Sequence, residues 1–420
     1  AIDEDLEALE REVGKLNRPA KQPGEKQTPK RQALPADLPR HDIHHEPDST
    51  TCTAPGCGCQ MKRIGEDVAE KLDYEPGRFS VERHVRGKWA CAKCQTLTQA
   101  PVPACVIDKG LATAGLMAHV VVAKYIDHQP LYRQEAVLGR AGYAVPRSTQ
   151  AEWIGAIGVE LAPLVQAMPE DLLGRRVLHA DETPVAMLKP GHGKTHRAYL
   201  WSYCTTAWDD INAVVFDFAE SRAGHNAKRF LGIDEGGSAG WRGTLICDDY
   251  AGYKQVMNAG VTEAGCLAHA RRKFHELWAN HQSTLAEGAL KLFGVLYDIE
   301  REARDLQSDE RLRLRQARSR PAADLLHAWL MANRQKVPDG SATAKAIDYS
   351  LKRWAALTRF IDDGDLAADN NRIENLIRPI ALGRKNWLFA GSLRAGQRAA
   401  AIMSLLHTAR LNGHEPYAYL

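Results

Sequence analysis

The spacing of hydrophobic and polar positions changes several times along the chain, and each change marks an expected element. Leucine and valine recur at helical spacing near the start, and a Pro-, Lys- and Gln-rich segment typical of a flexible linker follows. A cysteine-rich segment with a strand-like run comes next, and then a long helical pattern. The pattern predicts a short helix with a basic linker (1–39), a cysteine module (40–105) and a helical segment (106–172).

The pattern becomes rich in β-type runs from residue 173 onward. Three strand-like runs are followed by a helical run and then by the strand of "GTLICDDYAGY", which is typical of an α/β sheet. Helical spacing then returns for about a hundred residues. We therefore expect a multidomain α/β protein with a first core part (173–267), an inserted helical region (268–365) and C-terminal helices that complete the core (366–420).

The late stretch "DNNRIENLIRPIALGRKNW" permits two interpretations of its glutamate. Asn371 followed three residues later by Glu374 fits a capping box, which would start a helix. A carboxylate at the rim of the apolar stripe of that helix could equally lie beside a cleft. Pro379 predicts that the helix kinks or ends before the basic segment that contains Arg384 and Lys385.

Composition narrows the class of protein. The apolar content of 44% and the charged content of 25% are those of a soluble globular protein, and a net charge of +3 does not by itself indicate nucleic acid. No apolar run reaches the ~18 to 20 residues of a membrane helix, and no secretory signal is visible, so we expect a cytoplasmic protein without a membrane partner. Nine cysteines in such a chain favour free thiols and metal over a disulfide framework.

Two cysteine pairs predict a zinc site. Cys52 and Cys57 flank a Pro-Gly turn, and Cys91 and Cys94 form "CAKC". Each pair can make one knuckle of a tetrahedral site with four thiolates. Cys59 in "CGCQ" competes with Cys57 as the second ligand, and reduced cysteines without metal are the alternative. A lone zinc module implies binding or a structural role and no reaction.

The segment "PLYRQEAVLGRAGYAVPRSTQAEWIGAI" is a candidate DNA-binding unit. It reads as a helix, a turn and a second helix that Thr149 and Glu152 would start as a capping box. A helix-turn-helix places its second helix in the major groove, with Arg133, Arg140 and Arg147 available for phosphates. Two packed helices joined by a short turn are also common in proteins that bind no DNA.

Two other motifs resemble phosphate sites without requiring one. "PGHGKT" lacks the first glycine of a phosphate-binding loop and is better interpreted as a hairpin turn between the first two strands. "RLRLRQARSR" places five arginines in ten residues. This run could follow a phosphate backbone, or it could be a solvated helix face balanced by nearby acids.

Three carboxylates form the candidate catalytic set. Asp181 and Asp248 each follow apolar residues near a strand end, where ligands gather in α/β sheets, and Glu374 lies on the late helix. Because side chains alternate along a strand, Glu182 and Asp249 compete with their neighbours for the same face. Three such carboxylates can bind two divalent ions about 4 Å apart, which activate an attacking water and stabilise the leaving oxygen of a phosphodiester. Hard oxygen ligands select Mg²⁺ or Mn²⁺.

The motifs "HADETPV", "CDDYAGY", "CLAHARRKF" and "DNNRIENLIRPIALGRKNWLFAGS" together resemble the DDE transposases of the insertion sequence sixty-six family. The resemblance implies a ribonuclease H-like catalytic core with an inserted helical region, preceded by a zinc-ribbon-like module and a helical segment. Carried over to this sequence, the family's triad falls on Asp181, Asp248 and Glu374. The "DDY" motif leaves Asp249 as a departure from the family's pattern.

The same resemblance implies an activity and its partners. The expected reaction is metal-dependent cleavage at the ends of an insertion sequence, followed by strand transfer into target DNA. The catalytic ion would be Mg²⁺ or Mn²⁺, the zinc would be structural, and Cys266 and His269 would support the site as a "C-x-x-H" motif. Expected partners are DNA, further copies of the chain and two small accessory proteins, with Arg384 and Lys385 as further DNA contacts.

Two rival functions remain open at this point. One is a structure-selective DNA nuclease that performs the same hydrolysis without strand transfer. The other is a zinc-containing DNA-binding protein whose carboxylates are structural and catalyse nothing.

Overall fold

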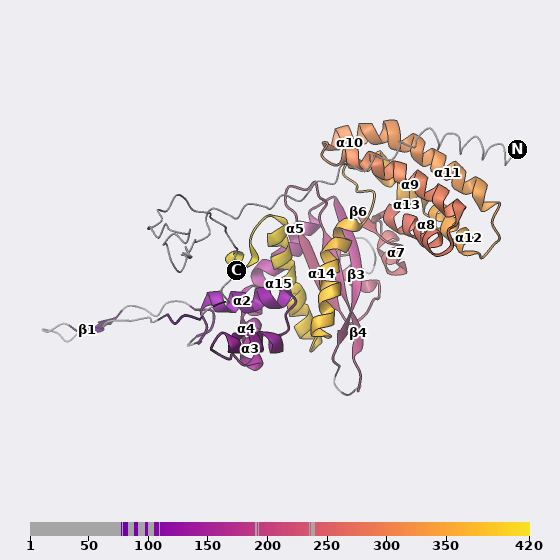
Figure 1. Cartoon of the computed structure of the whole chain (residues 1–420). Coiled ribbons are helices and arrows are strands. Elements are labelled where there is room, and N and C mark those ends of the chain that lie inside the picture. Colours follow the sequence, from indigo (N-terminus) through magenta and orange to yellow (C-terminus); the bar gives the residue numbers. More distant parts are fainter. Residues whose placement is uncertain are drawn as a thin grey trace, which may run out of the picture. The chain divides into compact units, whose positions relative to one another are not determined.

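The computed structural model describes most of the chain from residue 105 onward (Figure 1). Two compact units divide the chain, Pro19–Glu82 and the combination of Ala1–Arg18 with Arg83–Leu420, and all elements named below belong to the latter. The helix expected in residues 1–17 and the cysteines expected to bind zinc lie outside the described residues. The described residues are 77, 79–82, 88–90, 97–99, 105–108, 110–189, 191, 193–234, 236 and 240–420.

A five-stranded mixed sheet forms the centre of this unit. Its order is β5-β4-β3-β6-β7, in which β3, β4 and β5 pair antiparallel while β6 and β7 run parallel to β3. "PGHGKT" lies in the turn between β3 and β4, so the predicted hairpin is confirmed. The strands are β3 (Val177–Met187), β4 (His196–Cys204), β5 (Val214–Ala219), β6 (Thr244–Cys247) and β7 (Thr262–Gly265), and a separate antiparallel pair is formed by β1 (Lys88–Ala90) and β2 (Leu97–Gln99).

Helices precede, interrupt and follow the sheet. None of the helices in the described part of the chain is long and apolar enough to cross a membrane. Before and within the sheet they are α2 (Ala114–Tyr125), α3 (Leu131–Arg140), α4 (Arg147–Glu160), α5 (Ala162–Leu173), α6 (His225–Phe230) and α7 (Ala251–Met257). After β7 they are α8 (Leu267–His281), α9 (Thr284–Ala303), α10 (Ser308–Leu314), α11 (Arg320–Arg334), α12 (Ala342–Lys352), α13 (Trp354–Thr358), α14 (Asn371–Trp387), α15 (Leu393–Leu411) and α16 (Pro416–Tyr419).

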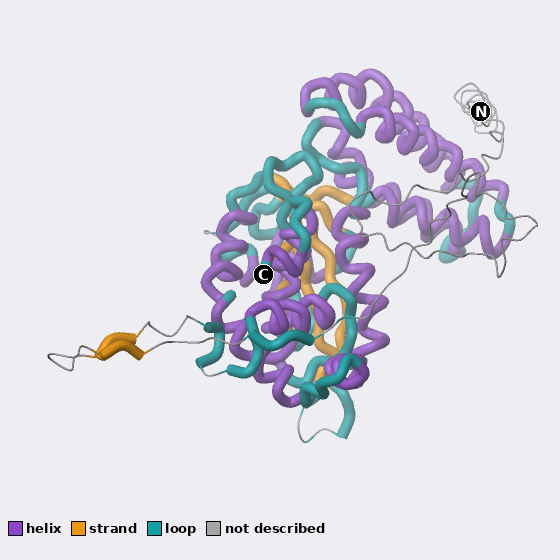
Figure 2. Tube along the Cα trace, turned by 60° about the vertical axis from the view of Figure 1, so that its left-hand side comes forward, coloured by secondary structure: helices purple, strands orange, loops and turns teal. Residues whose placement is uncertain are grey.

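Helices cover both faces of the sheet (Figure 2). On one face, Ala180 and Trp201 belong to an apolar core that continues into α5, α6 and α7. The alternate positions of the strands point the other way, and α14 and α15 cover them. There the backbone N–H of Phe216 on β5 donates to the hydroxyl of Ser404 on α15 at 2.8 Å. Asp181 lies on this second face, because alternation separates it from Ala180.

The helix-turn-helix pattern yields two helices, α3 and α4, but the predicted capping box is wrong. The helix α4 begins at Arg147 after Pro146, and no side chain caps it. Thr149 therefore lies inside the first turn, where it cannot act as the N-cap residue. Pro146 supplies a fixed φ near −57° immediately before the helix, which favours this earlier start.

The helices between β7 and α14 share one hydrophobic core with the edge of the sheet. Phe274 of α8, Phe293 of α9 and Trp329 of α11 belong to the same buried cluster as Ile246 of β6 and Ala264 of β7. Burial of large aromatic side chains contributes most to such a core. The helical region is therefore packed onto the sheet as well as connected to it in sequence.

The arginine run is only partly the solvated face balanced by acids that the sequence offered: Arg318 is exposed and pairs with Glu302, whereas two other members are buried. Arg311 is 1% exposed and donates to the carbonyl oxygens of Ala303 (3.3 Å) and Gly364, and Arg315 is 0% exposed and forms an ion pair with Glu300 at 2.6 Å. Charged groups are tolerated in the interior only when they are paired and hydrogen-bonded. These arginines hold the helical region together and do not follow a phosphate backbone.

The prediction that the helix ends at Pro379 is wrong, since α14 runs to Trp387 with Pro379 inside it; the alternative, a kink at Pro379, stays a prediction. Pro379 is exposed, and the residue one turn earlier, Asn375, is exposed as well. The backbone carbonyl that loses its helical partner can therefore be hydrated by water. Ile373 and Ile377 are buried in the core, and their packing keeps the helix continuous.

Candidate active site

A single amide side chain fixes the start of α14 against the central strand. Asn370 is fully buried; its Nδ2 donates to the carbonyl oxygen of Ala180 at 2.8 Å, and its Oδ1 lies 2.9 Å from Nδ1 of His179. Its backbone N–H donates to Sγ of Cys266 at 3.1 Å. Asn370 therefore joins β3, the start of α8 and the start of α14, and it determines where Glu374 lies.

The histidine in this network is neutral. Burial lowers the pKa of His179 to about 4, although its hydrogen bond to Asn370 opposes this. Because Nδ2 of Asn370 already donates to Ala180, its Oδ1 must accept, so Nδ1 of His179 carries the hydrogen. Neither residue stands out in the sequence, where "DNN" reads as helix-start residues and His179 as one polar position in an apolar run.

Asp181 lies half-buried at the middle of β3, so the prediction that it lies near a strand end is wrong. Burial is the largest cause of a pKa raised to about 8, and the negative charge of Glu182 comes next. The charges of Asp248 and Glu374 raise the pKa further, whereas the backbone N–H of Glu182, at 2.8 Å from Oδ1, opposes the rise. Asp248 and Glu374 are thus each near enough to Asp181 for their charges to act on its carboxyl group.

The neighbour of Asp181 is a partnered structural carboxylate on the opposite face of the sheet. The side chain of Glu182 is 1% exposed, accepts from Nε of Arg222 at 2.7 Å and accepts from the hydroxyl of Tyr253 at 2.8 Å. These donors satisfy both of its oxygens. Alternation along β3 therefore leaves Asp181, and not Glu182, facing α14.

Asp248 and Asp249, the second pair of adjacent acids, also differ in their surroundings. Asp248 follows β6 directly, and its Oδ1 accepts from the backbone N–H of Tyr250 at 2.9 Å at the start of α7. The carboxylate of Asp249 forms an ion pair with Arg353, whose Nη2 also donates to Glu263 at 2.6 Å. The charge of Asp249 is thus compensated by a protein cation, whereas Asp248 raises the pKa of Asp181.

Glu374 lies in the first turn of α14, and the predicted capping box with Asn371 is wrong. Asn370 is the N-cap residue, and the backbone N–H and Nδ2 of Asn371 donate to Asp369 at 3.0 and 2.8 Å. The carboxylate of Glu374 faces α8 instead. Its Oε1 lies 3.6 Å from Nδ1 of His269, and its Oε2 accepts from Arg272 at 3.3 Å.

The predicted supporting residues lie beside this glutamate. One ligand atom each from Cys266, His269 and Glu374 lie within 4.8 Å of one another. Burial raises the pKa of the Cys266 thiol to about 12, so in the absence of a metal the sulfur is protonated at neutral pH.

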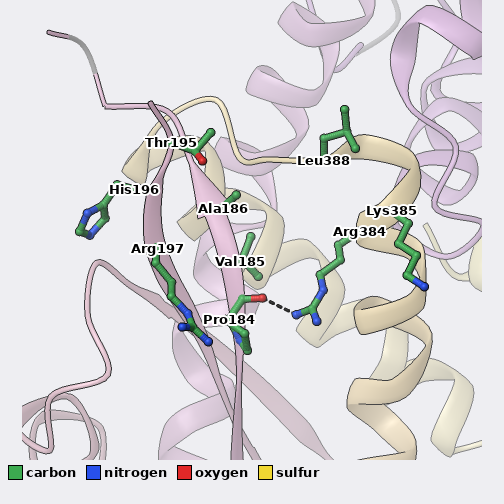
Figure 3. A pocket seen from close by; sticks show the side chains of 9 residues that line it. All are labelled: Pro184, Val185, Ala186, Thr195, His196, Arg197, Arg384, Lys385 and Leu388. Atoms are coloured by element: carbon green, nitrogen blue, oxygen red, sulfur yellow. Dashed lines mark hydrogen bonds between the residues drawn. The ribbon is translucent and has the colours of Figure 1, made fainter. Parts of the chain in front are cut away.

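The end of α14 brings basic side chains to the same strand (Figure 3). Arg384 donates to the hydroxyl of Thr183 at 2.9 Å and to the carbonyl oxygen of Pro184. Arg197 of β4 lines the same pocket, and Lys385 is exposed and points away from the strand. Arg384 is therefore held by the protein itself, whereas Lys385 is available to a ligand.

The other predicted DNA contacts lie on α3 and α4. Arg140 and Arg147 are exposed. Arg133 donates to Oδ1 of Asn386 at 3.4 Å, which connects α3 to the end of α14. One basic side chain of the helical segment thus contacts α14 at the residue that follows Lys385.

Comparisons with known proteins identify the family. Residues 109–398 match a family model described as "Transposase IS66 family", and residues 50–95 match one described as "zinc-finger binding domain of transposase IS66". The "Uncharacterized protein y4jD" of Sinorhizobium fredii (strain NBRC 101917 / NGR234) is 35% identical over 92% of this chain and 76% of its own. The "Uncharacterized protein y4qI" of the same organism is 36% identical over 100% of this chain and 78% of its own. The chain belongs to the IS66 transposase family.

Proposed function

We propose that this protein is a DDE transposase that cleaves DNA at the ends of its own insertion sequence and joins them to target DNA. The observation that carries the proposal is that Asp181 on β3 lies near enough to Asp248, after β6, and to Glu374, on α14, for the charges of both to raise its pKa. The order of the sheet, with three antiparallel strands followed by two parallel ones, supports a ribonuclease H-like core.

The donor set fits hard divalent cations. A carboxylate whose pKa is raised by burial and by other carboxylates is stabilised in its ionised form by a bound cation. Asp181, Asp248 and Glu374 would together hold the catalytic ions. Bound Mg²⁺ or Mn²⁺ ions would supply the activation of water and the stabilisation of the leaving oxygen.

The remaining residues of the site orient the carboxylates. Asn370 ties the first turn of α14 to β3, so that a helix and a strand far apart in sequence present their acids together. Arg384 of α14 is hydrogen-bonded to Thr183 and Pro184, and it therefore places a positive charge beside the strand that carries Asp181. Its charge and that of Lys385 would attract the DNA backbone next to the carboxylates.

We further propose that Cys52, Cys57, Cys91 and Cys94 hold the zinc of the zinc-finger domain. This would give a zinc-ribbon-like module over residues 40–105 that contacts DNA. Two small accessory proteins and further copies of the chain remain the proposed protein partners, and the cytoplasm remains the proposed location.

The decisive experiment compares two neighbouring acids. Purified protein is incubated in Mg²⁺ with DNA that carries candidate element ends, and both cleavage and joining are scored. Asp248→Asn should abolish cleavage, whereas Asp249→Asn, the matched control, should retain it because its ion pair with Arg353 lies outside the carboxylate group. The reverse pattern would refute the assignment. Cleavage of branched DNA without joining would favour the structure-selective nuclease.

A further inference from the structure

Two buried polar atoms of the site face each other without a hydrogen bond. They are Nδ1 of His269 and Oε1 of Glu374, which lie 3.6 Å apart. Neither atom has a hydrogen-bond partner among the described residues. Buried polar groups are satisfied in more than nine of ten cases, so such a pair requires an explanation. The sulfur of Cys266 completes a triangle of donor atoms within 4.8 Å.

The donor types indicate which ligand would satisfy these atoms. Sulfur, imidazole nitrogen and one carboxylate oxygen form a set that selects zinc and related softer ions over Mg²⁺. In a tetrahedral zinc site, bonds of about 2.3 Å to sulfur and about 2.0 to 2.1 Å to nitrogen and oxygen put ligand atoms roughly 3.3 to 3.7 Å apart. The His269 and Glu374 atoms already have this spacing at 3.6 Å, and all three donor atoms lie within 4.8 Å of one another.

We propose that Cys266, His269 and Glu374 form a binding site for a divalent ion of the zinc class, separate from the zinc-finger domain. The local structure is suited to hold it. Cys266 is 1% exposed and precedes α8, so its sulfur and the His269 ring lie on the same side of the first helical turn. The backbone N–H of Asn370 donates to that sulfur at 3.1 Å, as outer-shell donors do at metal sites.

Occupation of this site has a consequence for catalysis, which rests on the proposed function. Glu374 belongs to both donor sets, and its other oxygen already accepts from Arg272 at 3.3 Å. An ion that binds Oε1 beside His269 holds the carboxylate toward α8 and removes it from the set with Asp181. Zinc-class ions at this site would therefore inhibit Mg²⁺-dependent cleavage.

The binding itself can be tested without any assay of activity. Full-length wild type, Cys266→Ser and His269→Asn are dialysed against Zn²⁺, and the zinc bound per chain is measured together with the melting temperature. Wild type should hold one more zinc per chain than either variant, and added Zn²⁺ should raise its melting temperature more. Cys204→Ser is the matched control, since it removes an equally buried thiol away from the triangle and should retain the wild-type zinc count. Equal zinc content in wild type, Cys266→Ser and His269→Asn would overturn the proposal.

The inhibition is tested on the same proteins. In Mg²⁺, Zn²⁺ should slow wild-type cleavage, and Cys266→Ser should need at least about tenfold more Zn²⁺ for the same fractional loss of its own rate. Equal sensitivity with different zinc counts would refute the competition for Glu374. If no protein cleaves DNA in Mg²⁺, the proposed function fails, while the zinc count still decides whether the site exists.

Discussion

Replacement of Asp181 by asparagine should stabilise the protein when no divalent ion is bound at the active site. The pKa of Asp181 rises from 3.8 to about 8 on folding, mainly through burial and the charge of Glu182. An acid with a raised folded-state pKa binds more protons in the native state, so it opposes folding increasingly as pH rises from about 4 to about 8. Asparagine has nearly the same shape and carries no charge.

The magnitude follows from the same values. At pH 7, a carboxyl whose pKa changes from 3.8 to about 8 opposes folding by at most ~4 kcal/mol. Solvent screening of the half-buried side chain reduces this, and we expect Asp181→Asn to gain about 1 to 3 kcal/mol. That gain corresponds to a rise of roughly 1 to 3 °C in melting temperature for a chain of 420 residues. Below about pH 4 the variant and the wild type should be equally stable, because the carboxyl is then protonated in both states.

Circular dichroism melts between pH 4 and pH 8, with and without added Mn²⁺, provide the assay. Mn²⁺ should raise the melting temperature of the wild type and of the control Asp249→Asn, whose carboxylate is paired with Arg353, but not that of Asp181→Asn. Two results would refute the reasoning: a metal-free Asp181→Asn less stable than wild type at pH 7, or an equal response of all three proteins to Mn²⁺.

Three further predictions concern other parts of the structure. Asn370→Ala leaves the Ala180 carbonyl and the His179 N–H buried without partners, so urea denaturation should reveal a loss of about 2 to 6 kcal/mol, against less than about 0.5 for the exposed Asn375→Ala. Arg315→Ala leaves Glu300 unpaired and should cost about 3 to 5 kcal/mol in the same assay, whereas the exposed Arg313→Ala should be nearly neutral. Lys385→Ala should weaken DNA binding and reduce the salt dependence of binding by about one unit of slope in a titration, and an unchanged slope would exclude a phosphate contact.

The sequence predicts those features that depend on local pattern. Apolar runs locate the strands. Because side chains alternate along β3, the sequence already shows that only one of Asp181 and Glu182 can face the candidate site. The structure then decides which acid is on which face, because Arg222 and Tyr253 come from distant segments. The same holds for Asp249, whose partner Arg353 lies about a hundred residues later.

The features that the sequence does not predict depend on remote partners. Arg311 reads as a solvated charge until Gly364 and the ring of Trp208, 3.6 Å from its guanidinium, are found around it. Pro379 reads as a helix end because local rules omit the packing of Ile373 and Ile377 beneath it. The contact by which Asn370 fixes α14 is not predicted, because its partner Ala180 is 190 residues earlier in the chain.

That separation of 190 residues between Asn370 and Ala180 also orders events during protein synthesis. The strand with Asp181 and the turn with Asp248 emerge from the ribosome long before α14. A nascent chain that has folded its sheet still lacks Glu374 and Asn370, the residue that positions it. The contact between Asn370 and Ala180 closes a long loop of the chain, and contacts between residues so far apart in sequence form late in folding. Glu374 therefore joins the proposed catalytic set last, so under the proposed function an incomplete chain would be unable to cut the DNA of its own cell.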